Sequence, residues 1–274
     1  MTAVFALISL SIGVSLLAPL VLARGTWRVR YPALAIALWL GTFTIGVTSL
    51  TGSVVVASVV VLVHAPTELF GEYGPMVASL FLWVGLGGVG ALITLAFTRS
   101  EPLTEAQRTT DIAATLLAAR SRYRVENIGG DYITYITDDR LIACCTSDGR
   151  ILISSGIEQA LPPAHVRAII EHERSHVRSR HARVIQLAQM GAACFPFLAC
   201  AREFGRTIRL LSELAADDAA ARVCGPAHLC NALNALGTQT GDDGMLLRAE
   251  RLASYPISAR AHRRHLEDVS VVLD

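Results

Sequence analysis

Long stretches without a charged side chain dominate the first part of this 274-residue chain, and they predict membrane-spanning helices. Three of them, residues 2–23, 32–63 and 76–98, each reach the about 20 predominantly apolar residues that a helix needs to cross a bilayer. From residue 99 onward charged residues are as frequent as in ordinary globular proteins. The pattern predicts a transmembrane domain over residues 1–98 and a globular domain over residues 99–274.

The charges beside these runs set their expected orientation. Arg24, Arg28 and Arg30 follow the first run, whereas the loop after the second run carries Glu68 and Glu72 and no basic residue. Short loops that are rich in arginine stay on the cytoplasmic side. We therefore expect a multi-pass protein of the inner (cytoplasmic) membrane, in contact with its lipids, with the N-terminus outside and the globular domain in the cytoplasm.

The globular part combines helical and extended patterns. Helices are expected over residues 103–120, 162–183 and 208–223, from apolar positions that recur every three or four residues. Short apolar runs between the first two helices predict strands, and an Asp-Gly turn joins the last two of them. These runs are residues 123–128, 132–137, 141–146 and 151–154. The expected fold class is α+β, mostly helical, with a small β-sheet.

Composition excludes several functions. The chain contains no lysine, so a Walker A phosphate loop, a protein kinase, a Schiff-base enzyme and a Ser-x-x-Lys penicillin-binding site do not fit. The net charge of +1, without an arginine-rich block, gives no reason to expect direct binding of nucleic acid. The six cysteines form no disulfide ladder or Cys-x-x-Cys pair, so free thiols in a reducing compartment are expected.

The sequence His172-Glu173-Arg174-Ser175-His176 carries the candidate chemistry. Histidines four residues apart share one face of a helix, so both imidazoles can reach one metal ion, with Glu173 beside them as a candidate catalytic group. Arg174 counts against a metal site, because the two middle positions of this motif are usually uncharged. The alternative is an exposed, charged helix face whose histidines are satisfied by other partners.

A catalytic zinc ion needs a third protein ligand and one open position. A third histidine six residues after the motif is excluded, because that residue is Ala182. Glu203 and Glu213 remain, and Glu213 is preferred because Asp217 follows it by one helical turn and could orient an imidazole. The expected metal site, with one Zn²⁺ per chain, is His172, His176 and Glu213. His181 is expected to lie in solvent beside its arginine neighbours.

Three segments, residues 151–157, 168–181 and 213–218, resemble the BlaR/MecR-type membrane zinc metallopeptidases, and the compact actinobacterial-like members in particular. The resemblance implies a zincin-like (gluzincin) domain on the cytoplasmic side, in which Glu173 is the general base. It also implies a cytoplasmic substrate, a transcriptional repressor of the winged-helix type. Sensing of β-lactams is not inherited, because no lysine is present for a penicillin-binding sensor.

Two other functions remain open at this point. An HtpX-like protease, which removes damaged membrane proteins, would use the same metal site; relatives of that type carry a His-Pro followed by an arginine, and Tyr255-Pro256 and Arg260 are the nearest counterparts. A non-catalytic membrane receptor or scaffold, with structural or absent zinc, is the second alternative. The oligomeric state is not determined by any of these patterns.

A fourth uncharged run, residues 184–200, lies between the metal-ligand candidates. A single crossing there would put Glu213 on the other side of a barrier of about 30 Å, although zinc ligands lie about 2 Å from the ion. We therefore expect a helix and turn that lies against the membrane surface or the first three spans. A strand near Ile151–Ser154 is expected to be exposed and to align an extended substrate.

Overall fold

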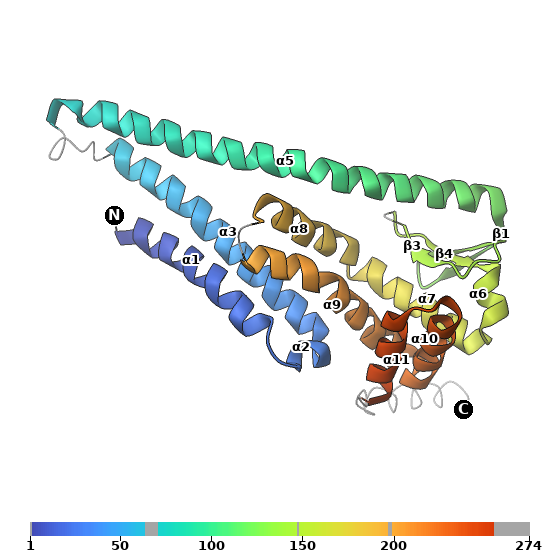
Figure 1. The fold of residues 1–274 in the computed structure, drawn as a ribbon. Coiled ribbons are helices and arrows are strands. Elements are labelled where there is room, and N and C mark those ends of the chain that lie inside the picture. Colours follow the sequence, from blue (N-terminus) through green and yellow to red (C-terminus); the bar gives the residue numbers. More distant parts are fainter. Residues whose placement is uncertain (1, 64–70, 147, 197–198, 255–274) are drawn as a thin grey trace, which may run out of the picture. The chain divides into compact units, whose positions relative to one another are not determined.

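The computed structural model describes residues 2–63, 71–146, 148–196 and 199–254. Within these residues the chain is mostly helical, with one four-stranded sheet (Figure 1). It divides into two compact units, which are described separately. The first comprises residues 1–28, 33–105 and 186–209, and the second comprises residues 29–32, 106–185 and 210–274.

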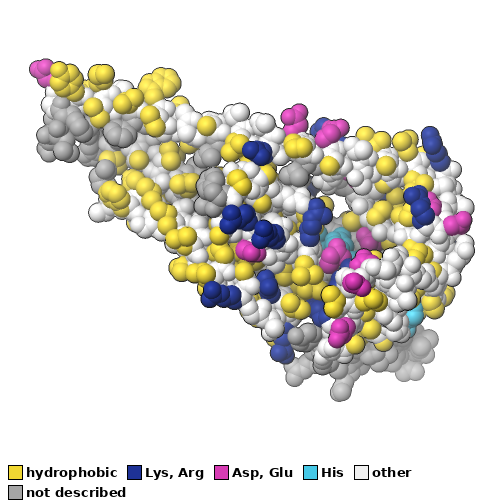
Figure 2. Space-filling model, in the orientation of Figure 1, with side chains coloured by type: hydrophobic (Ala, Val, Ile, Leu, Met, Phe, Trp, Pro, Cys, Tyr) yellow, Lys and Arg dark blue, Asp and Glu magenta, His cyan; other side chains and the backbone are white. Residues whose placement is uncertain are grey.

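Long apolar helices form the first unit. They are α1 (Thr2–Leu22), α3 (Pro32–Val63) and the first part of α5 (Gly74–Ser121), with the short α2 (Trp27–Arg30) and the 3-10 turn η1 (Gly71–Tyr73) beside them. Three described segments, Thr2–Leu22, Pro32–Val60 and Gly71–Ser121, are long and apolar enough to cross a membrane. The three apolar helices expected from the sequence are therefore present, and Figure 2 shows apolar side chains covering much of their surface.

Parts of two later helices complete the first unit. Residues 186–209 include the second part of α8 (His181–Cys194) and the first part of α9 (Ala199–Cys224). Phe204 stacks on Trp39 of α3, with ring centroids 5.6 Å apart. A Cβ atom on Gly191 would lie 3.0 Å from the ring of Phe43, so this glycine allows α8 to approach α3 closely.

The sheet of the second unit has the order β1-β2-β4-β3. Strands β1 (Arg122–Ile128) and β2 (Asp131–Ile136) form an antiparallel hairpin through Gly129 and Gly130, whose φ angles are 60° and 91°. Strand β4 (Ile151–Ser154) pairs in parallel with β2 and antiparallel with β3 (Ala143–Cys145). The expected hairpin between the last two strands is therefore confirmed.

The expectation that the strand Ile151–Ser154 is exposed is wrong. This strand, β4, lies between two partners, and all four of its residues are buried. Its run of Ile-Leu-Ile is the continuous apolar pattern of a strand that is covered on both faces. The edge strand on this side of the sheet is β3.

Helices pack on the sheet and form the hydrophobic core of the second unit with it. They are α6 (Ser155–Ala160), α7 (Pro163–Arg178), α10 (Pro226–Thr240) and α11 (Asp243–Ser254), together with the later part of α9. The buried side chains that they share with the sheet include Ile133, Ile151, Ile153, Ile169, Leu229, Leu233 and Leu252. Among these helices, α7 contacts β3, β4 and α10, which places it at the centre of the unit.

Two helix boundaries differ from those expected. The helix expected over residues 103–120 is the end of α5, which continues through Pro102 without a break. The helix expected over residues 162–183 ends at Arg178, because Arg180 adopts the left-handed conformation with φ of 51° and α8 then begins at His181. Pro163 occupies the first turn of α7, where its missing N–H costs no hydrogen bond.

Candidate metal centre

Two helices bring the expected donor atoms together. Helix α7 carries His172 and His176 one turn apart, and their Nε2 atoms are 3.1 Å from each other. Helix α9 contributes Glu213, whose Oε2 lies 3.3 Å from Nε2 of His172 and whose Oε1 lies 3.5 Å from Nε2 of His176. Among the described residues these three side chains form a group that could hold a metal ion.

The spacing of these atoms fits a zinc ion. Nitrogen and oxygen ligands lie about 2.0–2.1 Å from tetrahedral Zn²⁺, so any two of them are about 3.3 Å apart. The three observed separations of 3.1, 3.3 and 3.5 Å match this value without movement of the helices. Two imidazoles and one carboxylate are also the donors that catalytic zinc sites use, with a fourth position left open.

Asp217 lies directly behind the first histidine. Its side chain is fully buried one turn after Glu213 on α9, and its Oδ1 is 3.0 Å from Nδ1 of His172. The distance is that of an ion pair, although the pair lacks the geometry of a hydrogen bond. The contact fixes the ring so that Nε2, and not Nδ1, faces the other donors, as expected for a carboxylate behind a metal-binding histidine.

Arg248 is a site residue that the sequence analysis missed. It belongs to α11, and its guanidinium makes hydrogen bonds of 2.8 and 2.7 Å to the two carboxylate oxygens of Asp217. Its Nη1 is 2.9 Å from Oε2 of Glu213, and its Nη2 is 3.4 Å from Nε2 of His172. No motif in the sequence predicts that this arginine contacts the site. Arg260, the expected counterpart of the arginine in HtpX-type relatives, lies outside the described residues.

His181 was expected in solvent, and this expectation is wrong. Its side chain is buried, with 4% of its surface exposed, because the chain turns at Arg180 and α8 begins directly afterwards at His181. Its Nδ1 lies 3.1 Å from Nδ1 of His176. One of these two nitrogens can donate a hydrogen bond to the other. His181 can therefore hold the ring of His176 in place, as Asp217 holds the ring of His172.

Opposite charges are paired within the donor group. Burial raises the pKa of Glu213, but His172 and Arg248 outweigh this effect and hold the pKa at about 2. Burial lowers the pKa of His172, yet its contacts with Asp217 and Glu213 raise it to about 9, whereas burial and His172 lower the pKa of His176 to about 4. Without a metal, a proton on His172 and the guanidinium of Arg248 balance the carboxylates of Glu213 and Asp217, and a bound metal ion would replace that proton.

Glu173 lies in the wall of the cavity that contains the donors. The cavity has a volume of about 910 Å³, including its open mouth, and is also lined by His172, His176, Glu213 and Arg248. Burial raises the pKa of Glu173, so its carboxylate is a stronger base than an exposed one. Figure 2 shows histidine and acidic side chains gathered in one hollow of the surface, with arginines nearby.

The charge of Arg174 does not disturb this site. The residue lies on the opposite side of α7, where its Nε is 2.7 Å from Asp131, its Nη1 contacts Glu171 and its Nη2 donates to the carbonyl of Ile128 at 2.8 Å. The charge at this position of the motif is therefore compatible with a metal site, because Arg174 binds the β1–β2 hairpin and does not face the donor atoms.

Two histidines of one helix and a carboxylate of another are the donor set that zinc metallopeptidases use. A family model described as peptidase family M48 matches residues 107–208. M48 peptidases are zinc enzymes, so the match supports a zinc metallopeptidase. It includes His172, Glu173 and His176 but ends before Glu213, whose assignment depends on the geometry. No curated protein and no solved structure matches the chain.

Proposed function

We propose that this protein is a membrane-bound zinc endopeptidase. The observation that carries the proposal is the triangle of donor atoms from His172, His176 and Glu213, with Glu173 in the same cavity. A structural zinc site is normally closed by four protein ligands. Here three donors face an open cavity, an arrangement that supports catalysis over a purely structural or receptor role.

The chain's own groups supply the remaining parts of peptide hydrolysis. The chemistry that zinc contributes when bound is Lewis-acid polarisation of the scissile carbonyl and of the attacking water. An Oε atom of Glu173 accepts the proton of that water and then delivers it to the nitrogen of the leaving amine. Asp217 and His181 hold the two imidazoles in place, and Arg248 keeps the carboxylate of Glu213 ionised.

Strand β3 is the proposed support for an extended substrate. Ala143, Cys144 and Cys145 line the same cavity as Glu173, and β3 pairs with a single neighbour, β4, in the described sheet. A peptide that adds a strand to this edge gains main-chain hydrogen bonds, which hold it independently of its sequence. Its scissile bond then lies beside Glu173.

Substitution of Glu173 by glutamine tests the mechanism, because the amide keeps the shape but cannot take up the proton. Purified Glu173→Gln should retain one zinc per chain and cleave a fluorogenic unfolded protein about 10²- to 10⁴-fold more slowly. Glu250→Gln makes the same change at an exposed glutamate of α11 and should leave the rate unchanged. A zinc-loaded Glu173→Gln variant that cleaves at the parent rate would contradict the mechanism.

The substrate proposed is a cytoplasmic transcriptional repressor of the winged-helix type, so that the enzyme acts as an antirepressor in a BlaR/MecR-like signalling system. The support is the resemblance of residues 151–157, 168–181 and 213–218 to that family. Cleavage of a purified candidate repressor at one site supports this role. Cleavage of misfolded membrane proteins alone, with every repressor intact, overturns it in favour of HtpX-like quality control.

The proposed location is the cytoplasmic membrane, with the N-terminus outside and the metal centre in the cytoplasm. Three helices of sufficient length support the membrane location. The arginines around the first loop support the orientation. Residues introduced as Arg178→Cys and Arg209→Cys flank the run 184–200, and both should be labelled from the cytoplasmic side only. Labelling from opposite sides would overturn both the orientation and the metal site.

A further inference from the structure

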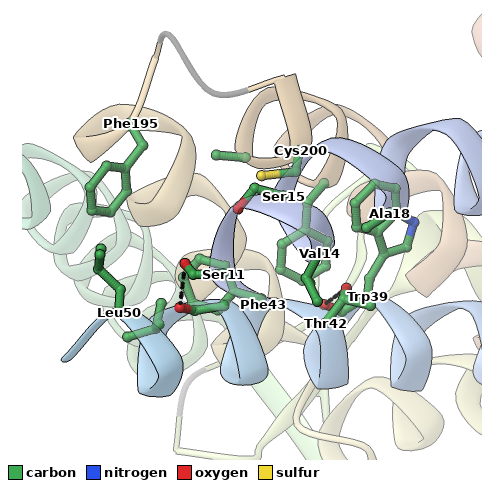
Figure 3. A pocket seen from close by; sticks show the side chains of 14 residues that line it. Ser11, Val14, Ser15, Ala18, Trp39, Thr42, Phe43, Leu50, Phe195 and Cys200 are labelled. Atoms are coloured by element: carbon green, nitrogen blue, oxygen red, sulfur yellow. Dashed lines mark hydrogen bonds between the residues drawn. The ribbon is translucent and has the colours of Figure 1, made fainter. Parts of the chain in front are cut away.

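The first unit contains a cavity that the proposed peptidase mechanism does not use (Figure 3). Its volume is about 570 Å³, including its mouth, and it lies between α1, α3 and the adjoining ends of α8 and α9. Helix α3 lines it with one face, since the residues involved recur at helical spacing: Trp39, Thr42, Phe43, Gly46, Val47 and Leu50. All of its lining residues belong to this one unit.

Small residues on two helices explain why the space is open. Helix α1 turns Ser11, Ser15 and Ala18 toward the cavity, and α3 contributes Gly46. The hydroxyl of Ser11 donates to the carbonyl of Gly46 at 3.0 Å, which holds the two helices together at this level. A Cβ atom added to Gly46 would meet nothing nearer than the Ser15 oxygen at 4.0 Å. A side chain larger than glycine at position 46 would therefore extend into the cavity.

Aromatic rings make the opposite wall rigid. Phe204 of α9 stacks on Trp39 at 5.6 Å and packs against Phe43 at 6.1 Å. Rings fixed on two sides cannot easily turn to fill the space, because tightly packed side chains stay in their rotamers. The three rings therefore form one packed wall of the cavity.

Two polar groups of the lining lack partners. The Nε1 of Trp39 is buried and has no hydrogen-bond acceptor within the described residues. The half-buried hydroxyl of Ser15 has no hydrogen-bond partner among the described residues either, whereas those of Ser11 and Thr42 donate to carbonyls of α3. Buried donors are rarely left unsatisfied, so the lining suits a ligand that carries an oxygen acceptor.

We propose that this cavity binds an acyl chain of a membrane phospholipid together with its ester carbonyl. With α1 and α3 across the bilayer, as in the membrane location proposed above, the medium at the mouth is lipid. Apolar cavities of this kind do not hold water well. A flexible hydrocarbon chain matches the apolar lining, and the ester oxygen supplies the acceptor. The proposal rests on the proposed membrane location and not on the metal centre.

Fluorescence of Trp39 reports occupation of the cavity. Trp39 is 1% exposed, whereas Trp83 is 71% exposed and Trp27 is partly exposed. The full chain with Trp27→Phe and Trp83→Phe is placed in phosphatidylcholine vesicles whose acyl chains carry bromine, which quenches indole fluorescence on contact. Strong quenching of the shielded Trp39 is expected, because a bromine atom can reach it only from inside the cavity. Absence of quenching overturns the proposal.

Filling the cavity provides the matched control. Gly46→Phe should abolish most of the quenching, and the smaller Gly46→Leu should reduce it partly. Gly41→Phe makes the same change on the same helix at an exposed position where a Cβ meets nothing within 4 Å, and quenching should persist. Equal quenching in Gly46→Phe and Gly41→Phe overturns the proposal. Ether-linked brominated lipids, which lack the carbonyl, should quench less, and equal quenching by them overturns the role of the ester.

Discussion

Replacement of Arg174 by alanine is expected to destabilise the second unit strongly. The Arg174 side chain is only 7% exposed, and it pairs with Glu171, also 7% exposed, and with Asp131, 18% exposed. Its loss leaves the buried carboxylate of Glu171 without this cation, leaves Asp131 with only the exposed Arg178, and removes one donor from the carbonyl of Ile128. Breaking a buried ion pair from one side costs about 3–5 kcal/mol.

The neighbouring Arg178 provides a control for this prediction. It contacts the same oxygen of Asp131 at 3.2 Å, but its side chain is 54% exposed, so Arg178→Ala should cost only about 0–1 kcal/mol. Thermal unfolding of the purified variants measures both effects. With about 2–4 °C per kcal/mol for a domain of this size, Arg174→Ala should lower Tm by about 6–20 °C. Equal Tm values for the two variants would refute the assignment of Arg174 as a buried structural ion-pair partner.

Two further substitutions test other parts of the second unit. Asp217→Asn should lower the zinc affinity about 10- to 100-fold, measured by competition with a chelator, because the amide holds the His172 ring less firmly; unchanged affinity would remove Asp217 from the site. Gly156→Ala should cost about 1–3 kcal/mol in the free energy of unfolding, because its Cβ would lie 2.5 Å from the carbonyl oxygen of Asp139. An unchanged denaturation midpoint would show that the backbone can relax there.

Local patterns in the sequence were enough to predict which donor side chains the structure brings together. His172 and His176 share a face by their spacing alone, and Asp217 lies one turn from Glu213. Arg248 could not be predicted in this way. It reaches Asp217 from a separate helix, and the packing of α11 on α10, which no short motif records, decides that contact.

The errors in the fold prediction also have physical causes. The run Ile151-Leu152-Ile153 is typical of a strand covered on both faces, but it does not specify the strand's neighbours, and the pairing of β4 with both β2 and β3 places it inside the sheet. His181 follows three polar residues, which suggests solvent. The left-handed turn at Arg180 instead redirects the chain and buries its imidazole against His176. Such reversals depend on tertiary packing.

The zinc content of the purified full-length protein tests the central claim most directly. The parent protein and Glu203→Gln should each contain one zinc per chain, because Glu203 takes no part in the group formed by His172, His176 and Glu213. Glu213→Gln makes the same change later on the same helix and should lose most of the metal after dialysis against a chelator, with its helical circular dichroism retained. Equal zinc content in the Glu213→Gln and Glu203→Gln variants would contradict the proposed metal centre.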